Sequence, residues 1–293
     1  MRVKVLPALV GAAITGLVIA VAPATASASA ADPTYYVSLG DSLAAGYQPN
    51  TNQNEPVSYT DDLFTTLKAS EPTLEHIRLG CSGETTETMI NGGKCAYPGA
   101  TSQLDAATRF LAAHKGKVKY VTEDIGANDI YRCVSSGAPD IGCITQGLNT
   151  IRTNLTKING QLHDAGGTEP VYVGMTYYTP TLASWLSGPS GKAVAVATAG
   201  ADNLLGATIT GANSGVGWKT ADVATAFSNN DFGNPVDVPG LGSLPHNVAQ
   251  ICLWTWMCTS YKDIHANPTG HQVIAKTFLP LLTKPGGGGS SGS

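Results

Sequence analysis

Short apolar runs alternate along the chain with segments whose apolar residues recur every three or four positions. The short runs are rich in Val, Ile, Leu and Tyr and predict buried β-strands. Four strands are expected at residues 35–39, 74–79, 118–125 and 171–175, with a weaker fifth near Val216. Helical spacing predicts helices at residues 59–69, 102–114, 148–162, about 192–208 and 269–282. This alternation predicts an α/β fold, in which helices cover both faces of a central parallel sheet of about five strands.

The N-terminal segment, residues 1–30, has the organisation of a secretory signal peptide. Arg2 and Lys4 precede an apolar run, and small residues then lead to a cleavage site at Ala28 or Ala30. A membrane anchor is the alternative interpretation, but the run is marginally short for a bilayer and is interrupted by Gly and Pro residues. The pattern therefore predicts a secreted, extracellular protein.

The remaining chain predicts a single domain over residues 31–285, followed by a Gly/Ser linker-like tail over residues 286–293. Charged residues make up 13% of the chain, the formal net charge is −4, and no basic run occurs. This composition argues against nucleic acid as a partner and against electrostatic docking on anionic lipid. No second apolar stretch is long enough to span a membrane, so we expect no integral membrane segment after signal cleavage. We expect a monomer.

The six cysteines fall into three local couples. An even count in an exported chain indicates disulfides, although six cysteines allow fifteen pairings. Zinc is the alternative, but the sequence has no CxxC pair and no histidine at ligand spacing from two cysteines, so no metal site is expected. The spacing favours the bridges Cys81–Cys95, Cys133–Cys143 and Cys252–Cys258.

Four polar motifs stand at the ends of predicted strands or just before the last predicted helix. Gly40-Asp41-Ser42-Leu43 follows the first strand, Gly83 follows the second, and Gly126-Ala127-Asn128-Asp129 follows the third. Asp263 and His265 precede the last helix. Each motif alone is weak evidence, because Gly, Asp, Ser and Asn are common turn residues. Ligands of parallel sheets bind beyond the carboxyl ends of the strands, so the order and positions of the motifs together indicate one site there.

Together these motifs resemble the GDSL/SGNH hydrolase family, and in particular its secreted lipases and esterases of actinobacterial type. The resemblance extends over essentially the whole mature chain, from residue 36 to about residue 282. It implies the three-layer, flavodoxin-like fold of SGNH hydrolases and the cleavage of carboxylic acyl esters without a metal or cofactor. The residues that give the family its name correspond here to Ser42, Gly83, Asn128 and His265.

The resemblance assigns a role to each of these residues. Ser42 is the nucleophile, and His265 is the general base that takes its proton. The backbone N–H groups of Ser42 and Gly83 and the side-chain amide of Asn128 form the oxyanion hole. Water then hydrolyses the acyl-enzyme, with the same histidine as base.

Asp263 is expected to complete the triad by orienting His265. Many relatives carry this aspartate three residues before the histidine, followed by proline, whereas here the spacing is two and Ala266 stands where proline often does. A backbone carbonyl of residues 253–255 is therefore an alternative partner for the imidazole.

Several other polar residues receive structural interpretations. His271 is expected to be a partly exposed residue of the closing helix. Asp41 and Asp129 are expected to bond to N–H groups of nearby turns. Glu123 interrupts an apolar strand and requires either an edge position or a buried partner.

The expected substrate is a small-molecule or lipid ester. Residues 176–250 are poor in charge, and their non-helical parts are expected to be long surface loops. These loops and the Trp254-Thr255-Trp256-Met257 cluster favour lipid-like acyl esters, and the alternative explanation of the cluster is hydrophobic packing around the Cys252–Cys258 loop. Large apolar residues of the region are candidates for an acyl pocket or for the core, and burial statistics favour the core. They are Trp185, Leu186, Phe227 and Phe232.

Other activities use the same machinery or the same fold. A carbohydrate acetylesterase and a phospholipase are the alternative enzymes, and a non-catalytic binding module is the alternative to an enzyme. A lipase of the other α/β-hydrolase type needs a G-x-S-x-G nucleophile elbow, and residues 31–285 contain no such pattern.

Overall fold

The computed structural model describes residues 1, 3–4, 32–134 and 139–283. The chain divides into the units Met1–Ala31 and Asp32–Ser293, and the description below concerns the second. The predicted signal peptide lies outside the described residues except for residues 1, 3 and 4, and the predicted Gly/Ser tail lies entirely outside them.

The centre of this unit is a parallel sheet of five strands. The strands are β1 (Thr34–Gly40), β4 (Leu74–Arg78), β5 (Val118–Asp124), β6 (Val171–Met175) and β7 (Lys219–Ala221). Their spatial order is β4-β1-β5-β6-β7, and every neighbouring pair is parallel. This is the flavodoxin-like order, in which the direction of winding reverses between the first strand and the third, here β1 and β5. The predicted fold class is confirmed.

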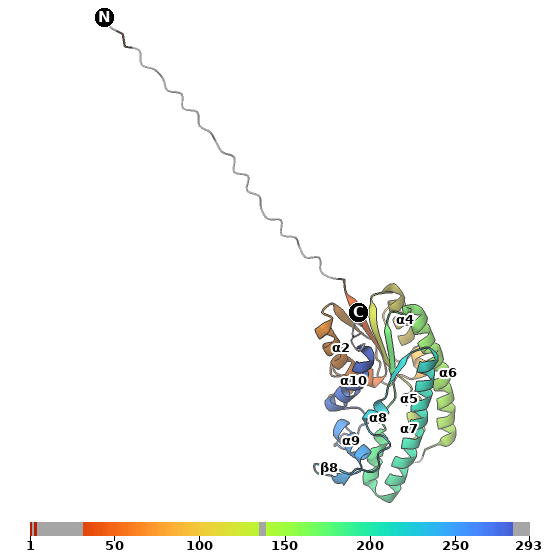
Figure 1. The fold of residues 1–293 in the computed structure, drawn as a ribbon. Helices are drawn as coiled ribbons and strands as arrows, with labels where there is room; N and C mark the ends of the chain where they lie inside the picture. Colours follow the sequence, from red (N-terminus) through yellow and green to blue (C-terminus); the bar gives the residue numbers. More distant parts are fainter. Residues whose placement is uncertain (2, 5–31, 135–138, 284–293) are drawn as a thin grey trace, which may run out of the picture. The chain divides into compact units, whose positions relative to one another are not determined.

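Helices cover both faces of the sheet and make the three layers visible in Figure 1. The helices α2 (Tyr59–Ser70) and α10 (Pro268–Leu282) pack together on one face. The other face carries α4 (Gln103–Ala113), α6 (Ile141–Gly166) and α7 (Pro189–Gly215). Shorter elements surround the carboxyl edge of the sheet. They are α1 (Ser42–Ala45), β2 (Tyr47–Gln48), β3 (Gln53–Asn54), α3 (Thr86–Asn91), α5 (Ala127–Tyr131), the 3₁₀ helix η1 (Pro180–Ser187), α8 (Val223–Ala226), β8 (Val236–Val238), β9 (Gly242–Leu244) and α9 (His246–Trp254).

Side-chain caps fix where the helices begin. Ser58 accepts a hydrogen bond from the N–H of Asp61, whose carboxylate accepts the N–H of Ser58, and this capping box starts α2. Asn267 accepts the N–H of Gly270 at the start of α10, where Pro268 occupies the first turn. The second cap bears on the site, because it ends the segment that carries His265.

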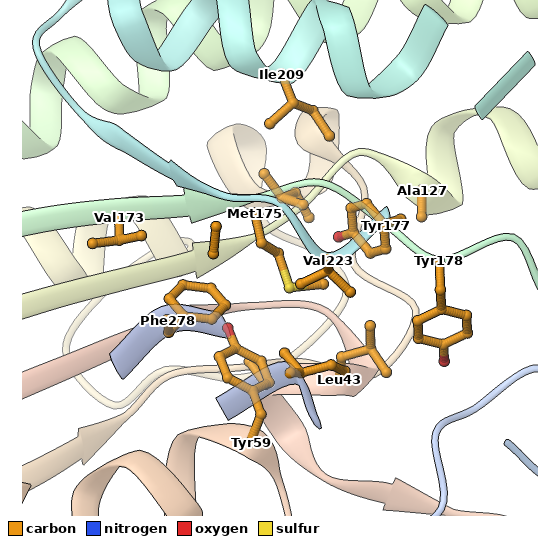
Figure 2. Packing of buried hydrophobic residues seen from close by; sticks show 14 of the residues in the cluster. Leu43, Tyr59, Ala127, Val173, Met175, Tyr177, Tyr178, Ile209, Val223 and Phe278 are labelled. Carbon is orange, nitrogen blue, oxygen red and sulfur yellow. The ribbon is translucent and has the colours of Figure 1, made fainter. Parts of the chain in front are cut away.

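The apolar faces meet in one continuous core. Figure 2 shows part of it, where Val173 and Met175 of β6 lie near Phe278 of α10. The Tyr59 and Phe278 rings stack with centroids 5.0 Å apart, which joins α2 to α10. Stacked rings of this kind stabilise by about 0.5–1.5 kcal/mol beyond the area that they bury.

The region of residues 176–250 differs from the sequence prediction. It contains η1, α8, the β8–β9 hairpin and the beginning of α9, so the expectation of long surface loops outside one helix was wrong. The helical spacing of apolar residues could not be recognised here because polar and small residues separate them. In α9, for example, the buried residues Val248, Ala249 and Ile251 lie within a short span of mixed composition. The fifth strand begins at Lys219, because Val216 caps the end of the preceding helix.

The candidate acyl-pocket residues of this region do not line the space around Ser42. Phe227 is completely buried and stacks on Tyr178 with ring centroids 4.6 Å apart. Trp185 and Phe232 pack on each other, and Leu186 is exposed. Packing therefore accounts for three of the four candidates.

All six cysteines form disulfides, and the bridges join Cys81 to Cys95, Cys133 to Cys143 and Cys252 to Cys258. Each bridge closes a local loop, and the Cys133–Cys143 bridge lies just after α5, the helix that carries Asn128. Within the described ranges, no helix has both the length and the apolar character needed to cross a membrane.

Candidate active site

Ser42 stands where the chain leaves the central sheet. Strand β1 ends at Gly40, whose φ of 140° lies in the left-handed half of the map; a Cβ there would lie 2.3 Å from Asp124 Oδ1. The Asp41 side chain then accepts the N–H of Leu43 at 3.0 Å and starts α1, as the sequence predicted for a turn residue. Ser42 is 9% exposed. Its hydroxyl is thus held at the switch point between β1 and β5, where flavodoxin-like sheets bind ligands.

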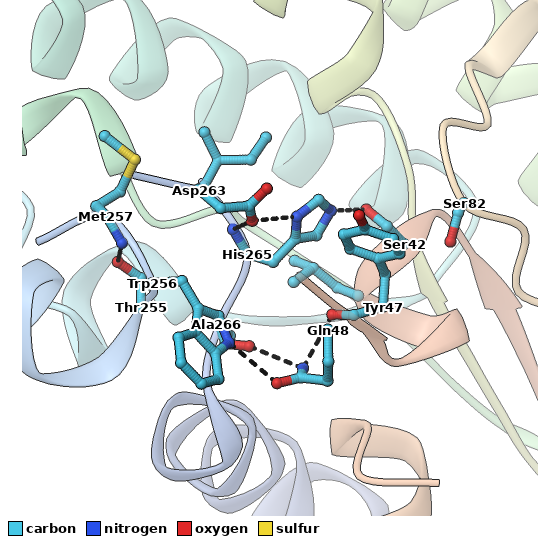
Figure 3. Close-up of polar contacts among 12 residues, drawn as sticks. Ser42, Tyr47, Gln48, Ser82, Thr255, Trp256, Met257, Asp263, His265 and Ala266 are labelled. Atoms are coloured by element: carbon cyan, nitrogen blue, oxygen red, sulfur yellow. Dashed lines mark hydrogen bonds and ion pairs between the residues drawn. The ribbon is translucent and has the colours of Figure 1, made fainter. Parts of the chain in front are cut away.

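A continuous hydrogen-bonded chain joins Asp263, His265 and Ser42 (Figure 3). Asp263 Oδ1 lies 2.6 Å from His265 Nδ1, and His265 Nε2 lies 2.7 Å from Ser42 Oγ. A carboxylate only accepts, so the imidazole donates from Nδ1 and its Nε2 is free to accept the serine proton. These are the distances and the tautomer that a serine nucleophile and its base require.

The Asp263 carboxyl is held in its ionised form, which accepts the Nδ1–H of the imidazole and so orients the ring. Burial acts to raise its pKa, but hydrogen bonds from the ring and the backbone N–H of His265, together with the imidazole charge, hold that pKa below the usual range. Two of the three alternative carbonyls, those of Leu253 and Trp254, accept hydrogen bonds from Asn267. Its side chain donates to the Leu253 carbonyl at 2.9 Å and its N–H donates to the Trp254 carbonyl at 3.0 Å. The geometry therefore favours Asp263 as the partner of His265.

A buried glutamine fixes the histidine loop, and no motif in the sequence marks it. Gln48 of β2 is 3% exposed. Its Nε2 donates to the Ala266 carbonyl at 3.1 Å, and its Oε1 accepts the indole N–H of Trp256 at 3.0 Å. The N–H of Trp256 in turn donates to the His265 carbonyl at 3.0 Å. Trp256, a member of the Trp254-Thr255-Trp256-Met257 cluster, thus supports the loop that carries His265 (Figure 3).

Two of the three predicted oxyanion residues line the same cleft as the base. The cleft is lined by Ser42, Asn128 and His265, among others. The Asn128 amide donates one hydrogen to the Glu84 carbonyl at 2.9 Å, which fixes its orientation and leaves its second hydrogen available. Gly83 is not among the lining residues; it adopts a left-handed φ of 78° directly before Glu84.

Gln103 connects the nucleophile strand to the segment that holds Asn128. Its Oε1 accepts the N–H of Gly40 at 2.7 Å, and its Nε2 donates to the Gly40 carbonyl at 3.0 Å and to Glu84 Oε2 at 3.0 Å. Burial raises the pKa of Glu84, and its Oε1 has no hydrogen-bond partner among the described residues. The sequence predicts only that Gln103 lies in the first turn of a helix. Its hydrogen bonds to Gly40 and Glu84 could not be predicted from the sequence.

A pair of buried carboxyl groups lies directly behind Ser42. The N–H of Asp41 donates to Asp124 Oδ2 at 3.2 Å, Tyr59 donates to Asp124 Oδ1 at 2.6 Å, and Tyr177 donates to Asp41 Oδ2 at 2.9 Å. Burial and the Asp41 charge raise the pKa of Asp124 well above its usual range. The pair is therefore held with a bound proton, since two adjacent buried carboxylates repel each other.

Two sequence interpretations need correction. His271 is completely buried, not partly exposed: its Nδ1 accepts the N–H of Tyr59 at 3.1 Å, and burial lowers its pKa to about 3. Glu123 lies on the central strand β5, so it has no edge position, and its Oε1 has no partner among the described residues. Burial raises the pKa of Glu123 to about 8. Asp129 bonds the N–H and hydroxyl of Thr86 at 2.9 and 2.6 Å, in agreement with its predicted structural role.

Across the described part of the chain, no group of three or more His, Cys, Asp or Glu side chains is arranged to hold a metal ion. The chemistry that the cleft offers is that of a serine hydroxyl, an imidazole base and an uncharged amide donor.

Solved structures with this fold include several ester hydrolases. The extracellular lipase of Streptomyces rimosus is 18% identical, with 85% of this chain and 98% of that chain covered and a TM-score of 0.51. Phospholipase A1 of Streptomyces albidoflavus NA297 is 18% identical over 85% of this chain and 98% of its own, with a TM-score of 0.50. A variant of the acetyl xylan esterase Axe2 of Geobacillus stearothermophilus is 14% identical over 86% of this chain and 95% of its own, with a TM-score of 0.50.

A comparison with curated proteins found no match. The model of the GDSL-like lipase/acylhydrolase family matches residues 38–273, from strand β1 to the first turns of α10. This span includes all four motifs and most of the sheet, and the chain belongs to the GDSL-like lipase/acylhydrolase family.

Proposed function

We propose that the protein is a secreted serine esterase that cleaves carboxylic acyl esters through a Ser42–His265–Asp263 triad. The observation that carries the proposal is the unbroken chain of short hydrogen bonds from Asp263 Oδ1 through both ring nitrogens to Ser42 Oγ. A structural histidine has no need of a serine hydroxyl on one nitrogen and a carboxylate on the other, whereas a general base requires both.

The reaction has two steps. Ser42 Oγ attacks the ester carbonyl while His265 Nε2 takes its proton, and Asp263 stabilises the resulting imidazolium. Collapse of the tetrahedral intermediate breaks the bond to the alkoxide, which leaves with the proton returned by His265. Water then attacks the acyl-enzyme with His265 again as base, and the acid is released.

The oxyanion of each tetrahedral intermediate requires donors that are already in place. We assign the N–H of Ser42, the N–H of Gly83 and the second amide hydrogen of Asn128 to this role. The hydrogen bond from Asn128 to the Glu84 carbonyl supports the assignment, because it fixes the amide before substrate binds. Loss of one such donor typically costs about 2.7–4 kcal/mol of barrier.

The first test is hydrolysis of p-nitrophenyl esters from acetyl to palmitoyl by the wild type and by Ser42→Ala. We expect turnover that depends on Ser42, together with stoichiometric labelling of Ser42 by a fluorophosphonate. Folded protein that neither turns over any ester nor reacts with the probe would refute the enzyme and favour a binding module.

The acyl preference distinguishes the related activities. An optimum at long chains indicates a lipase, and an optimum at acetyl indicates a carbohydrate acetylesterase; release of fatty acid from phospholipid vesicles tests a phospholipase. The names of the structural relatives include all three kinds of enzyme.

We also propose export and cleavage of residues 1–30, an active monomer over residues 31–285 and a linker-like tail over residues 286–293. The three disulfides support an oxidising compartment. Mass spectrometry of protein recovered from the culture medium tests the cleavage site at Ala28 or Ala30.

A further inference from the structure

A tyrosine that belongs to none of the four sequence motifs lies against the imidazole of the triad. The centroid of the Tyr47 ring, on β2, is 4.6 Å from that of the His265 ring, and the two ring planes are inclined at 55°. Figure 3 shows the two rings beside each other. Tyr47 is partly exposed, and the side chain of His265 is 14% exposed. The tyrosine therefore covers part of the base, and its π-electrons are close enough to act on it.

The hairpin that carries Tyr47 is bonded on both sides of the site. Tyr47 pairs with Asn54 across the β2–β3 hairpin, and its hydroxyl donates to Asn52 Oδ1 at 2.8 Å. The next residue is Gln48, which holds the histidine loop. On the other side, the Ser82 hydroxyl donates to Asn54 Oδ1 at 2.7 Å, which ties the hairpin to the segment after β4. The Tyr47 ring is thus held against the imidazole before any substrate binds.

The charge of the imidazole changes during the proposed reaction, whereas the tyrosine stays neutral. At rest, His265 donates from Nδ1 to Asp263 and accepts the Ser42 hydroxyl at Nε2, so the ring is neutral. It becomes an imidazolium when it takes the proton of Ser42, and again when it takes a proton from water. The π-face of an aromatic ring attracts a cation within about 6 Å of its centroid. The neutral imidazole receives much less of this attraction, so the interaction favours the transition state over the ground state.

We propose that Tyr47 is a positioning residue of the reaction, which acts through His265 by stabilising its imidazolium with a cation–π interaction. This assignment rests on the proposed esterase function. Tyr47 exchanges no proton: the proton passes from Ser42 Oγ to His265 Nε2 and then to the leaving alkoxide. Asp263 stabilises the same cation through the Nδ1–H bond, so the two residues act on different parts of one imidazolium.

The test varies the electron density of the ring at constant shape. Tyr47 is replaced by phenylalanine and by phenylalanines with one, two or three ring fluorines, which withdraw electrons from the π-face. With p-nitrophenyl acetate, Tyr47→Phe should keep kcat within about twofold of wild type, because the π-face remains. Successive fluorines should then lower kcat stepwise, to about three- to tenfold below Tyr47→Phe, and Tyr47→Leu should be similarly slow. KM should stay constant, because the imidazolium is absent from the ground state.

Tyr35 provides the matched control. Its ring lies against His114 with centroids 4.7 Å apart, at the opposite end of β1 from Ser42. The same series of substitutions at Tyr35 changes a tyrosine–histidine pair outside the site and should leave kcat unchanged. Circular dichroism of each variant confirms that the protein is folded.

The fluorinated series separates electrostatics from packing. A kcat that is equal across the series at Tyr47, or that rises with fluorine content, would overturn the cation–π assignment even if Tyr47→Leu is slow, because the ring would then serve only as packing. Such an enzyme would still hydrolyse esters, so the proposed function would stand. If the wild type hydrolyses no ester and Ser42 is unreactive towards the fluorophosphonate, the proposed function falls and the role of Tyr47 with it.

Discussion

Replacing Glu123 by glutamine isolates the energetic cost of a carboxyl group in the middle of the sheet. Glu123 is 2% exposed on the central strand β5, and its Oε1 has no hydrogen-bond partner among the described residues. Burial raises its pKa from 4.5 to about 8, so the folded protein keeps the group protonated at neutral pH while the unfolded chain ionises it. Glutamine has nearly the same shape and cannot ionise.

The sign and size of the effect follow from this difference. A group whose pKa is raised on folding leaves stability intact below the unfolded value and reduces it as pH rises towards the folded value. Between pH 4.5 and pH 7, the cost accumulates at about 1.36 kcal/mol per pH unit, which gives about 3 kcal/mol at pH 7. The loss reaches about 5 kcal/mol and levels off above pH 8. The glutamine variant should therefore gain on the wild type with rising pH.

The free energy of unfolding is measured by urea denaturation with the disulfides intact, and the fluorescence of the four tryptophans monitors the unfolding. The difference in unfolding free energy between Glu123→Gln and wild type should be about 3 kcal/mol larger at pH 7 than at pH 4. The control is Glu75→Gln on the edge strand β4, an exposed position whose carboxylate is in water in both states. A difference for Glu123→Gln that stays constant from pH 4 to pH 8 would refute the reasoning, because it would mean that the buried carboxyl ionises as easily as in the unfolded chain.

Three substitutions test the assignments in the site. Asp263→Asn should lower kcat by about 10³–10⁴-fold with little change in KM, because the amide supports the wrong tautomer of His265; an effect below about tenfold would transfer the orienting role elsewhere. Asn128→Ala should lower kcat by about 10²–10³-fold while Ser42 still reacts with a fluorophosphonate, and an unchanged kcat would remove Asn128 from the oxyanion hole. Gln48→Glu can still accept from the Trp256 indole but, when ionised, cannot donate to the buried Ala266 carbonyl. It should reduce stability by about 1–3 kcal/mol and lower kcat, and normal kinetics in a destabilised protein would make Gln48 a purely structural residue.

The sequence predicted the elements whose signal is local. β1, β4, β5 and β6 read as apolar runs, and α2, α4 and α10 as apolar residues at helical spacing, so their bounds agree with the prediction to within a few residues. The N-terminal turns of α6 were missed because its first buried residue, Ile144, is followed by polar positions. Helix α9 was missed for a similar reason, since a nine-residue helix offers too few repeats to reveal a period.

In the candidate site, too, the residues of local motifs could be predicted and the residues that support them could not. Ser42, Asn128, Asp263 and His265 were identified because each belongs to a short motif at a strand end or before a helix. Their supports act across long separations: Gln103 bonds Gly40 over 63 positions, Asp124 bonds Asp41 over 83, and Gln48 bonds Ala266 over 218. Such contacts depend on how strands and helices pack, and no spacing in the chain encodes them.

The chemistry of these supports makes the geometry of the proposed triad independent of pH. Gln48 and Gln103 each use an amide as donor and acceptor at once, so the two clamps that they form, on the histidine loop and on the nucleophile strand, carry no charge. Protonation between pH 6 and pH 8 therefore leaves those clamps intact.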